Sequence, residues 1–264
     1  MSRVPQHSPG PHELGQNFLV DHRILTRITS LVATTDGPIV ELAAGDGSLT
    51  GHLVRLRRPL TAVEVDPRHV TTLRRRFGRR VDVVAADILR HRAPSRPHVV
   101  VGNVPFHITT PVMRRLLRTP HWNQAVLITQ WEVARKRAGV GGATLLTAQW
   151  WPWFEADLVT RVPSSAFRPR PSVDAGVLHL TRRPAPWVSD RDRYQAFVKR
   201  VFSGPGRGVP DILRRAGVPK RAVNRWAAAV GVTARHLPRD LTAAQWVSAF
   251  EAQVADPDRR PGPQ

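Results

Sequence analysis

The chain of 264 residues contains no cysteine, which excludes disulfide bonds, thiolate metal sites and cysteine nucleophiles. Its eleven histidines are scattered without the spacing of a metal-binding motif, so we expect no metal site. No apolar run reaches the roughly 18 residues of a transmembrane helix, and Met1 to Pro11 lacks the apolar core of a signal peptide. We therefore expect a cytoplasmic protein that does not bind membranes.

Acidic residues and lysine are also scarce. The chain has 20 Asp and Glu residues but 40 Lys and Arg residues, which gives a formal net charge of +20. Only Lys136, Lys199 and Lys220 are lysines, so arginine carries most of the positive charge. A GC-rich genome explains arginine in place of lysine, but it does not explain the excess of basic residues. Because arginine forks bind phosphates and stack on bases, the composition favours a nucleic acid partner.

Strand-like and helix-like segments alternate through the first half of the chain. This alternation predicts an α/β fold with a mostly parallel sheet and helices on both faces. Two later strand-like runs, 157–162 and 175–180, are close enough in sequence to form an antiparallel pair, which predicts an antiparallel edge. We expect strands at 38–42, 60–64, 81–84, 98–101 and 124–129, and helices at 21–33, 48–56, 68–77 and 111–117.

A boundary is expected near residue 183, where two prolines interrupt the pattern. Residues 13–182 then form the α/β domain, including the tryptophan-rich segment 145–153, whose tryptophans we interpret as packing residues. Residues 183–255 form a small, basic, all-helical domain, with helices at about 190–202, 209–216, 219–230 and 241–253. Residues 1–12 and 256–264 are expected to be disordered tails.

Informative residues follow the first three strands of the predicted sheet. Gly45-Asp46-Gly47 follows the first strand, and its glycines let a ligand approach the backbone closely. Glu64 ends the second, about 20 residues on, where a carboxylate can accept hydrogen bonds from both ribose hydroxyls. After the third, Asp87 can accept from an adenine amino group while Ile88 packs against the ring. Because ligands of open α/β sheets bind at this edge, the pattern predicts a nucleoside cofactor.

The glycine loop discriminates between cofactors. Nicotinamide cofactors favour Gly-x-Gly-x-x-Gly, from which the spacing of Gly45, Gly47 and Gly51 departs. Asp46 would also repel a pyrophosphate. S-adenosylmethionine has no phosphate and carries cationic ammonium and sulfonium groups, so it fits an acidic loop better.

The fourth strand is followed by Asn103-Val104-Pro105-Phe106, which suits methylation of an exocyclic amine. The side-chain oxygen of Asn103 and the carbonyl of Val104 can hold the two hydrogens of an adenine amine and favour a more tetrahedral nitrogen. Pro105 rigidifies the turn, and Phe106 can stack on the base. By itself, an Asn-x-Pro turn is common in loops and indicates no particular function. Together with the other three strand ends, it predicts an adenine methyltransferase.

With these motifs assembled, residues 13–182 resemble the rRNA adenine N6-methyltransferase family, which includes the Erm macrolide-resistance enzymes and the KsgA-type small-subunit dimethyltransferases. The resemblance implies a Rossmann-like methyltransferase domain. It also implies a flap that places Gln16, Asn17 and Leu19 at the cofactor, and a second stacking platform for the target adenine at Phe167. The matching segments are 14–19, 41–47, Glu64, Asp87, 103–106, 130–137 and 162–171.

The stretch 130–137 and the basic helical tail most resemble Erm enzymes of antibiotic-producing actinomycetes. This resemblance implies a monomer that methylates one adenine in the peptidyl-transferase loop of 23S rRNA, before or during assembly of the large subunit. Such methylation blocks macrolides, lincosamides and streptogramin B. Two alternatives stay open: a 16S rRNA dimethyltransferase of ribosome maturation, and a non-catalytic RNA-binding factor with the same fold.

Two features depart from the family pattern, and one of them is the segment 204–210, which replaces the more basic pattern of the KsgA type. Ala43 stands where the first glycine of the cofactor loop is usual, and the turn tolerates it if φ is negative. The cofactor-binding set is therefore expected to be Gln16, Asn17, Leu19, Ala43, Gly45, Glu64, Asp87, Ile88 and Asn103. Basic residues on helices are candidates for RNA phosphate contacts, namely Arg74, Arg75, Arg76, Arg79, Arg80, Arg114, Arg115, Arg135, Lys136 and Arg137.

Overall fold

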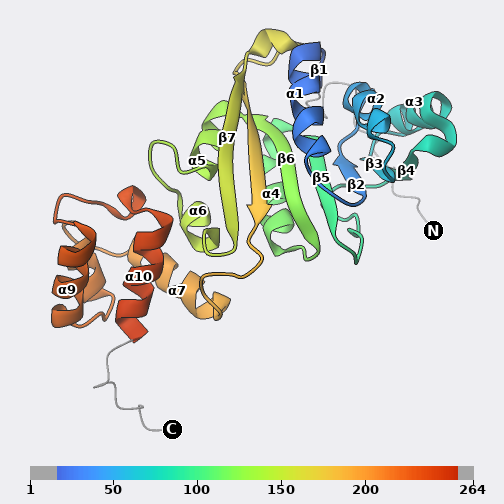
Figure 1. Ribbon diagram of the computed structural model, residues 1–264. Helices are drawn as coiled ribbons and strands as arrows, with labels where there is room; N and C mark the ends of the chain where they lie inside the picture. Colours follow the sequence, from blue (N-terminus) through green and yellow to red (C-terminus); the bar gives the residue numbers. More distant parts are fainter. Residues whose placement is uncertain (1–16, 255–264) are drawn as a thin grey trace, which may run out of the picture. The chain divides into compact units, whose positions relative to one another are not determined.

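The computed structural model describes residues 17–254, which form two compact units (Figure 1). Residues 17–134 and 157–181 make the first unit, and residues 135–156 and 182–254 make the second. The predictions for Gln16 and for the two tails lie outside the described residues. None of the helices within 17–254 is both long and apolar enough to cross a bilayer.

The first unit is built on a seven-stranded sheet with the order β4-β3-β2-β5-β6-β9-β7. The five strands from β4 to β6 pair in parallel, and β9 pairs antiparallel with β6. The predicted mixed sheet is thus confirmed. The strands are β2 (Ile39–Leu42), β3 (Leu60–Glu64), β4 (Asp82–Ala85), β5 (His98–Asn103), β6 (Trp122–Gln130), β7 (Phe154–Val162) and β9 (Ala175–Arg182).

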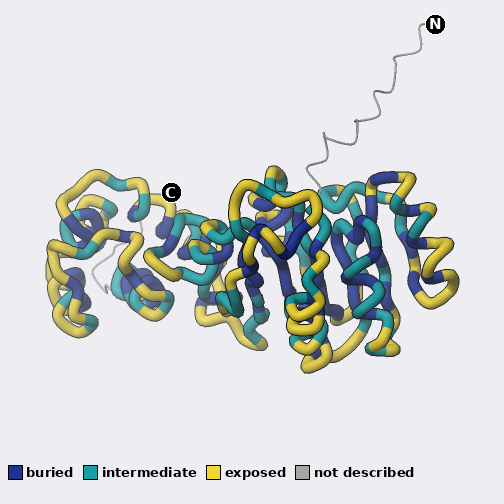
Figure 2. Tube along the Cα trace, turned by 90° about the horizontal axis from the view of Figure 1, so that it is seen from above, coloured by how far each residue is buried: buried dark blue, intermediate teal, exposed yellow. Residues whose placement is uncertain are grey.

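Helices cover both faces of this sheet, so its central strands are buried and their sequences are nearly all apolar. Figure 2 colours the buried segments dark blue. Helices α1 to α3 pack against one face, and α4 packs against the other. Asp21 begins α1 as predicted, because its carboxylate accepts the backbone N–H groups of Arg23 and Ile24. The helices are α1 (His22–Ala33), α2 (Ser48–Leu53), α3 (Pro67–Phe77), α4 (Thr109–Arg118) and α5 (Trp131–Arg137).

A two-stranded ribbon joins segments that are about 150 residues apart. Strand β1 (Phe18–Leu19) pairs antiparallel with β8 (Phe167–Arg168), and Leu19 lies opposite Phe167. The N–H of Val20 continues the ladder to the carbonyl of Ala166 at 2.9 Å. Neither strand was predicted from the sequence. The ribbon fixes the segment that was expected to form a flap.

The second unit has its own hydrophobic core. Residues 135–156, which the sequence analysis assigned to the α/β domain, belong to this unit instead. The reason is packing: the Tyr194 hydroxyl donates to the carbonyl of Ala148, and Trp151 and Trp153 lie against this core. The helices are α6 (Leu145–Trp150), α7 (Arg191–Phe202), α8 (Val209–Arg215), α9 (Lys220–Val230) and α10 (Ala243–Val254).

Candidate active site

One cavity of the first unit lies at the carboxyl ends of β2, β3 and β5. All the predicted catalytic and cofactor residues that the structure describes line it: Asn17, Leu19, Ala43, Gly45, Glu64, Asp87, Ile88, Asn103, Val104, Pro105 and Phe106. These residues come from five separate segments. The topology of the parallel sheet brings them together, because its strand ends meet at one edge.

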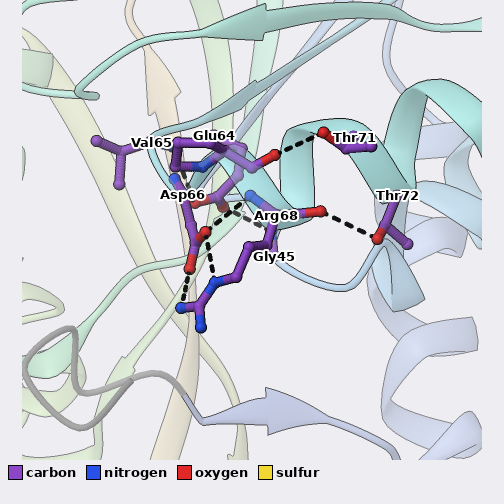
Figure 3. A network of polar contacts seen from close by, with 8 residues as sticks. Gly45, Glu64, Val65, Asp66, Arg68, Thr71 and Thr72 are labelled. Carbon is purple, nitrogen blue, oxygen red and sulfur yellow. Dashed lines mark hydrogen bonds and ion pairs between the residues drawn. The ribbon is translucent and has the colours of Figure 1, made fainter. Parts of the chain in front are cut away.

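Glu64 is held by three backbone N–H groups (Figure 3). Its Oε2 accepts from Gly45 at 2.8 Å, and its Oε1 accepts from Val65 and Asp66, both at 2.8 Å. The residue is buried, with only 2% of its surface exposed. A carboxylate has about four acceptor positions, so Glu64 keeps capacity for a further donor.

Asp66 shapes the same turn and begins α3. Its carboxylate accepts the backbone N–H of Arg68 at 2.9 Å and the guanidinium of the same residue at 2.7 Å. The hydrogen bond from the Arg68 side chain is the largest cause that lowers the pKa of Asp66 to about 2. The Glu64–Asp66 turn is therefore a fixed part of the cavity wall.

Three residues of the loop that follows β2 have a left-handed backbone, namely Ala43, Gly45 and Gly47. Gly45 has φ +54°, and a Cβ atom there would lie 2.8 Å from the Phe18 ring, so only glycine fits. Ala43 has φ +55°, so the negative φ under which the turn was expected to tolerate alanine is not present. A left-handed alanine costs about 1 kcal/mol or more, because its Cβ crowds the backbone. The loop thus stores strain beside the cavity.

Glu41 is a carboxyl group that the sequence analysis did not assign to the site. It is 1% exposed at the end of β2, lines the cavity, and accepts a 2.7 Å hydrogen bond from the Thr50 hydroxyl. Its pKa is raised to about 8, chiefly by burial and also by the nearby carboxylates of Asp46 and Glu64, while the Thr50 hydrogen bond lowers it in part. Glu41 is therefore mainly protonated at neutral pH. Glu41 could have been recognised from the sequence, because it is the one acidic residue in an otherwise apolar strand.

Asp87 and Ile88 follow β4 and form another wall of the cavity. The Oδ1 atom of Asp87 accepts the N–H of Leu89 at 2.8 Å, and Arg90 lies 4.0 Å from its other oxygen. The side chain is 43% exposed, so it remains accessible to a donor.

The turn that follows β5 fixes the orientation of Asn103. The Nδ2 of Asn103 donates to the backbone carbonyl of Asn17 at 2.6 Å. Because only the amide nitrogen can donate to a carbonyl, this bond assigns Oδ1 as the other end of the side chain. The N–H of Val104 donates to the carbonyl of Ile128 at 3.1 Å, which ties the turn to β6. Asn103 is thus positioned by the β1 segment.

The two predicted stacking residues differ in position. Phe106 is half-buried and lines the cavity. Phe167 does not line it: its side chain is fully buried in the core of the first unit, where β8 pairs with β1. This corrects the expectation of a stacking platform at Phe167, because a ring with 0% exposure offers no face to a base.

The basic candidates also divide into two groups. Arg115 and Arg137 are partly buried and bond within the protein, to the carbonyl of His91 and to the hydroxyl of Thr144 respectively. Arg135 is also partly buried. The exposed candidates are Arg74, Arg75, Arg76, Arg79, Arg80, Arg114 and Lys136.

Sequence comparison places the chain among rRNA adenine methyltransferases. The ribosomal RNA adenine dimethylase family matches residues 10–253. The mycinamicin-resistance protein MyrB of Micromonospora griseorubida is 52% identical over 244 residues, which cover 91% of this chain and 78% of MyrB. An rRNA adenine N-6-methyltransferase of Corynebacterium diphtheriae is 49% identical over 211 residues, covering 79% and 83% of the two chains.

The fold agrees with these relatives. The crystal structure of the 23S rRNA methyltransferase ErmE superimposes with a TM-score of 0.84 and 33% identity, covering 90% of this chain and 100% of that one. Methyltransferases of this fold use S-adenosylmethionine as the methyl donor. The cavity suits this cation, since it is lined by the carboxylates of Asp46, Glu64 and Asp87 and by no lysine or arginine of the described residues. The chain therefore belongs to the ribosomal RNA adenine dimethylase family of S-adenosylmethionine-dependent methyltransferases.

Proposed function

We propose that this protein methylates N6 of one adenine in the peptidyl-transferase loop of 23S rRNA and thereby protects ribosomes from macrolide, lincosamide and streptogramin B antibiotics. The single observation that carries the chemistry is the Asn103–Phe106 turn on the wall of an acidic cavity. The target is supported by the similarity to a mycinamicin-resistance protein and to the 23S rRNA methyltransferase ErmE.

The cofactor would lie against the strand ends of the cavity. When bound, S-adenosylmethionine supplies an electrophilic methyl group on a sulfonium. Glu64 has acceptor capacity for a ribose hydroxyl, while Asp87 and Ile88 can receive the adenine amine and ring. Gly45 permits close approach of the backbone.

The Asn103 turn would prepare the nucleophile. The Oδ1 of Asn103 and the carbonyl of Val104 accept the two hydrogens of the target amine, which directs its lone pair toward the methyl group. Phe106 stacks on the target base, which must leave its RNA stack to enter the cavity. Catalysis then rests on positioning and electrostatics, and the proton of the product ammonium leaves to water.

The RNA would be held by exposed arginines and by the second unit. We propose the exposed residues Arg74, Arg75, Arg76 and Arg114 as phosphate contacts. Arg115 and Arg137 are left out because both are partly buried as well as hydrogen-bonded within the protein. Among the described residues the second unit carries 17 basic and 6 acidic residues, which suits an RNA-binding role. We place the reaction in the cytoplasm, on 23S rRNA before or during large-subunit assembly, with the protein as a monomer.

Antibiotic susceptibility tests the proposed function in cells. Expression in a susceptible bacterium should raise the inhibitory concentrations of a macrolide and of a lincosamide together. The Asn103→Ala variant, expressed to the same level, should leave both unchanged. Wild-type methylation that appears only in 16S rRNA, without resistance, would contradict the proposal.

A further inference from the structure

Trp187 in the second unit is the one exposed residue among the Phe, Tyr and Trp residues between 17 and 254, at 45% exposure. The other tryptophans of that range are buried or half-buried. A large exposed aromatic ring is an informative exception in a folded protein, since burying it would release apolar surface from water.

One face of this indole is already occupied by a fixed cation. The guanidinium carbon of Arg183 lies 3.7 Å from the centroid of the Trp187 ring. Arg183 is itself anchored, because Nη1 lies 2.6 Å from Glu155 Oε1 and Nε donates to the carbonyl of Trp151 at 3.2 Å. Its side chain is only 12% exposed. The second face of the ring is therefore the one that solvent can reach.

The backbone holds the ring in place as well. The N–H of Trp187 donates to the carbonyl of Pro152 at 3.0 Å, and the N–H of Arg183 donates to the carbonyl of Trp153 at 2.9 Å. A flat ring that is held in advance loses little conformational freedom when a second flat ring stacks on it. Arg191 and Arg193 follow within six residues but alternate with Asp190 and Asp192, so the positive charge is that of the whole unit rather than of this stretch.

We propose that the open face of Trp187 stacks an unpaired base of the rRNA substrate, outside the loop that carries the target adenine. This inference rests on the proposed function. A single ring suits a single base, whereas a protein interface requires a contiguous apolar patch. The excess of basic residues in this unit favours a polyanion over an acidic or apolar protein surface.

Binding of a 23S rRNA fragment that contains the peptidyl-transferase loop tests this contact. Trp187→Ala should weaken binding by about 5-fold to 100-fold, the range measured for loss of one base stack. Trp187→Phe, which retains a flat ring, should restore most of the affinity. The matched control is Leu237→Ala, because Leu237 is an exposed apolar residue of the same unit at 40% exposure, and it should bind like wild type.

The salt dependence separates stacking from charge. Trp187→Ala should leave the slope of log affinity against log salt unchanged, because no phosphate contact is lost. In methyl transfer it should raise KM for RNA and leave kcat and S-adenosylmethionine affinity unchanged. Equal affinity of Trp187→Ala and wild type, or a changed salt slope, would overturn the proposal. Failure of the wild type itself to bind or methylate 23S rRNA would instead refute the proposed function.

Discussion

Replacing Glu41 by glutamine should abolish a large pH dependence of stability. The pKa of Glu41 is raised from 4.5 to about 8 in the folded protein, chiefly by burial. Between these two pH values the folded state keeps a proton that the unfolded state has lost. The contribution of protonated Glu41 to the free energy of unfolding is therefore complete below about pH 4.5, and it is lost as the pH rises toward 8. Glutamine stays neutral throughout and can still accept the hydrogen bond of Thr50.

The size of the effect follows from the same shift. Each unit of pKa difference is worth about 1.4 kcal/mol, so the loss between pH 4.5 and 8 amounts to up to about 5 kcal/mol. Glu41→Gln should match the wild type in stability near pH 5. It should exceed the wild type by several kcal/mol near pH 8.5.

Urea unfolding from pH 5 to pH 9 measures this difference. Other titrating groups contribute equally to both proteins, so the quantity to plot is the difference in unfolding free energy between variant and wild type. Thr50→Val provides a second check, because loss of its hydrogen bond should raise the pKa of Glu41 further. A difference between Glu41→Gln and wild type that is constant over this pH range would refute the reasoning.

Three further substitutions test the loop and the turn. Ala43→Gly should raise the free energy of unfolding by about 1 kcal/mol by relieving the left-handed backbone, and a lower urea midpoint would argue against strain there. Gly45→Ala should weaken S-adenosylmethionine binding in calorimetry, because its Cβ meets the Phe18 ring, and unchanged affinity would show that the loop adapts. Asn103→Ala should keep RNA binding and lose at least about 100-fold in kcat, so wild-type-like turnover would remove Asn103 from the mechanism.

The site was predictable where a general rule of topology applied. The carboxyl ends of parallel strands meet at one edge, so Gly45, Glu64, Asp87 and Asn103 could be brought together from strand assignment alone. The N-cap at Asp21 was predictable for a similar reason, because capping depends on neighbours in sequence.

The rest depended on contacts between distant segments. The β1–β8 ribbon consists of two-residue strands, too short for any periodicity. The burial of Phe167 follows from that ribbon. The assignment of residues 135–156 to the second unit follows from packing against Tyr194, far along the chain. The φ of Ala43 is set by the loop as a whole, since the propensity of alanine favours the opposite sign.

Transfer of labelled methyl groups from S-adenosylmethionine to purified RNAs tests the central claim most directly. Protein-free 23S rRNA, protein-free 16S rRNA and immature 30S particles would be compared, and the modified base mapped by primer extension. We predict label at a single adenine of the peptidyl-transferase loop in 23S rRNA. Label confined to 30S particles, or RNA binding without any methylation, would contradict the account.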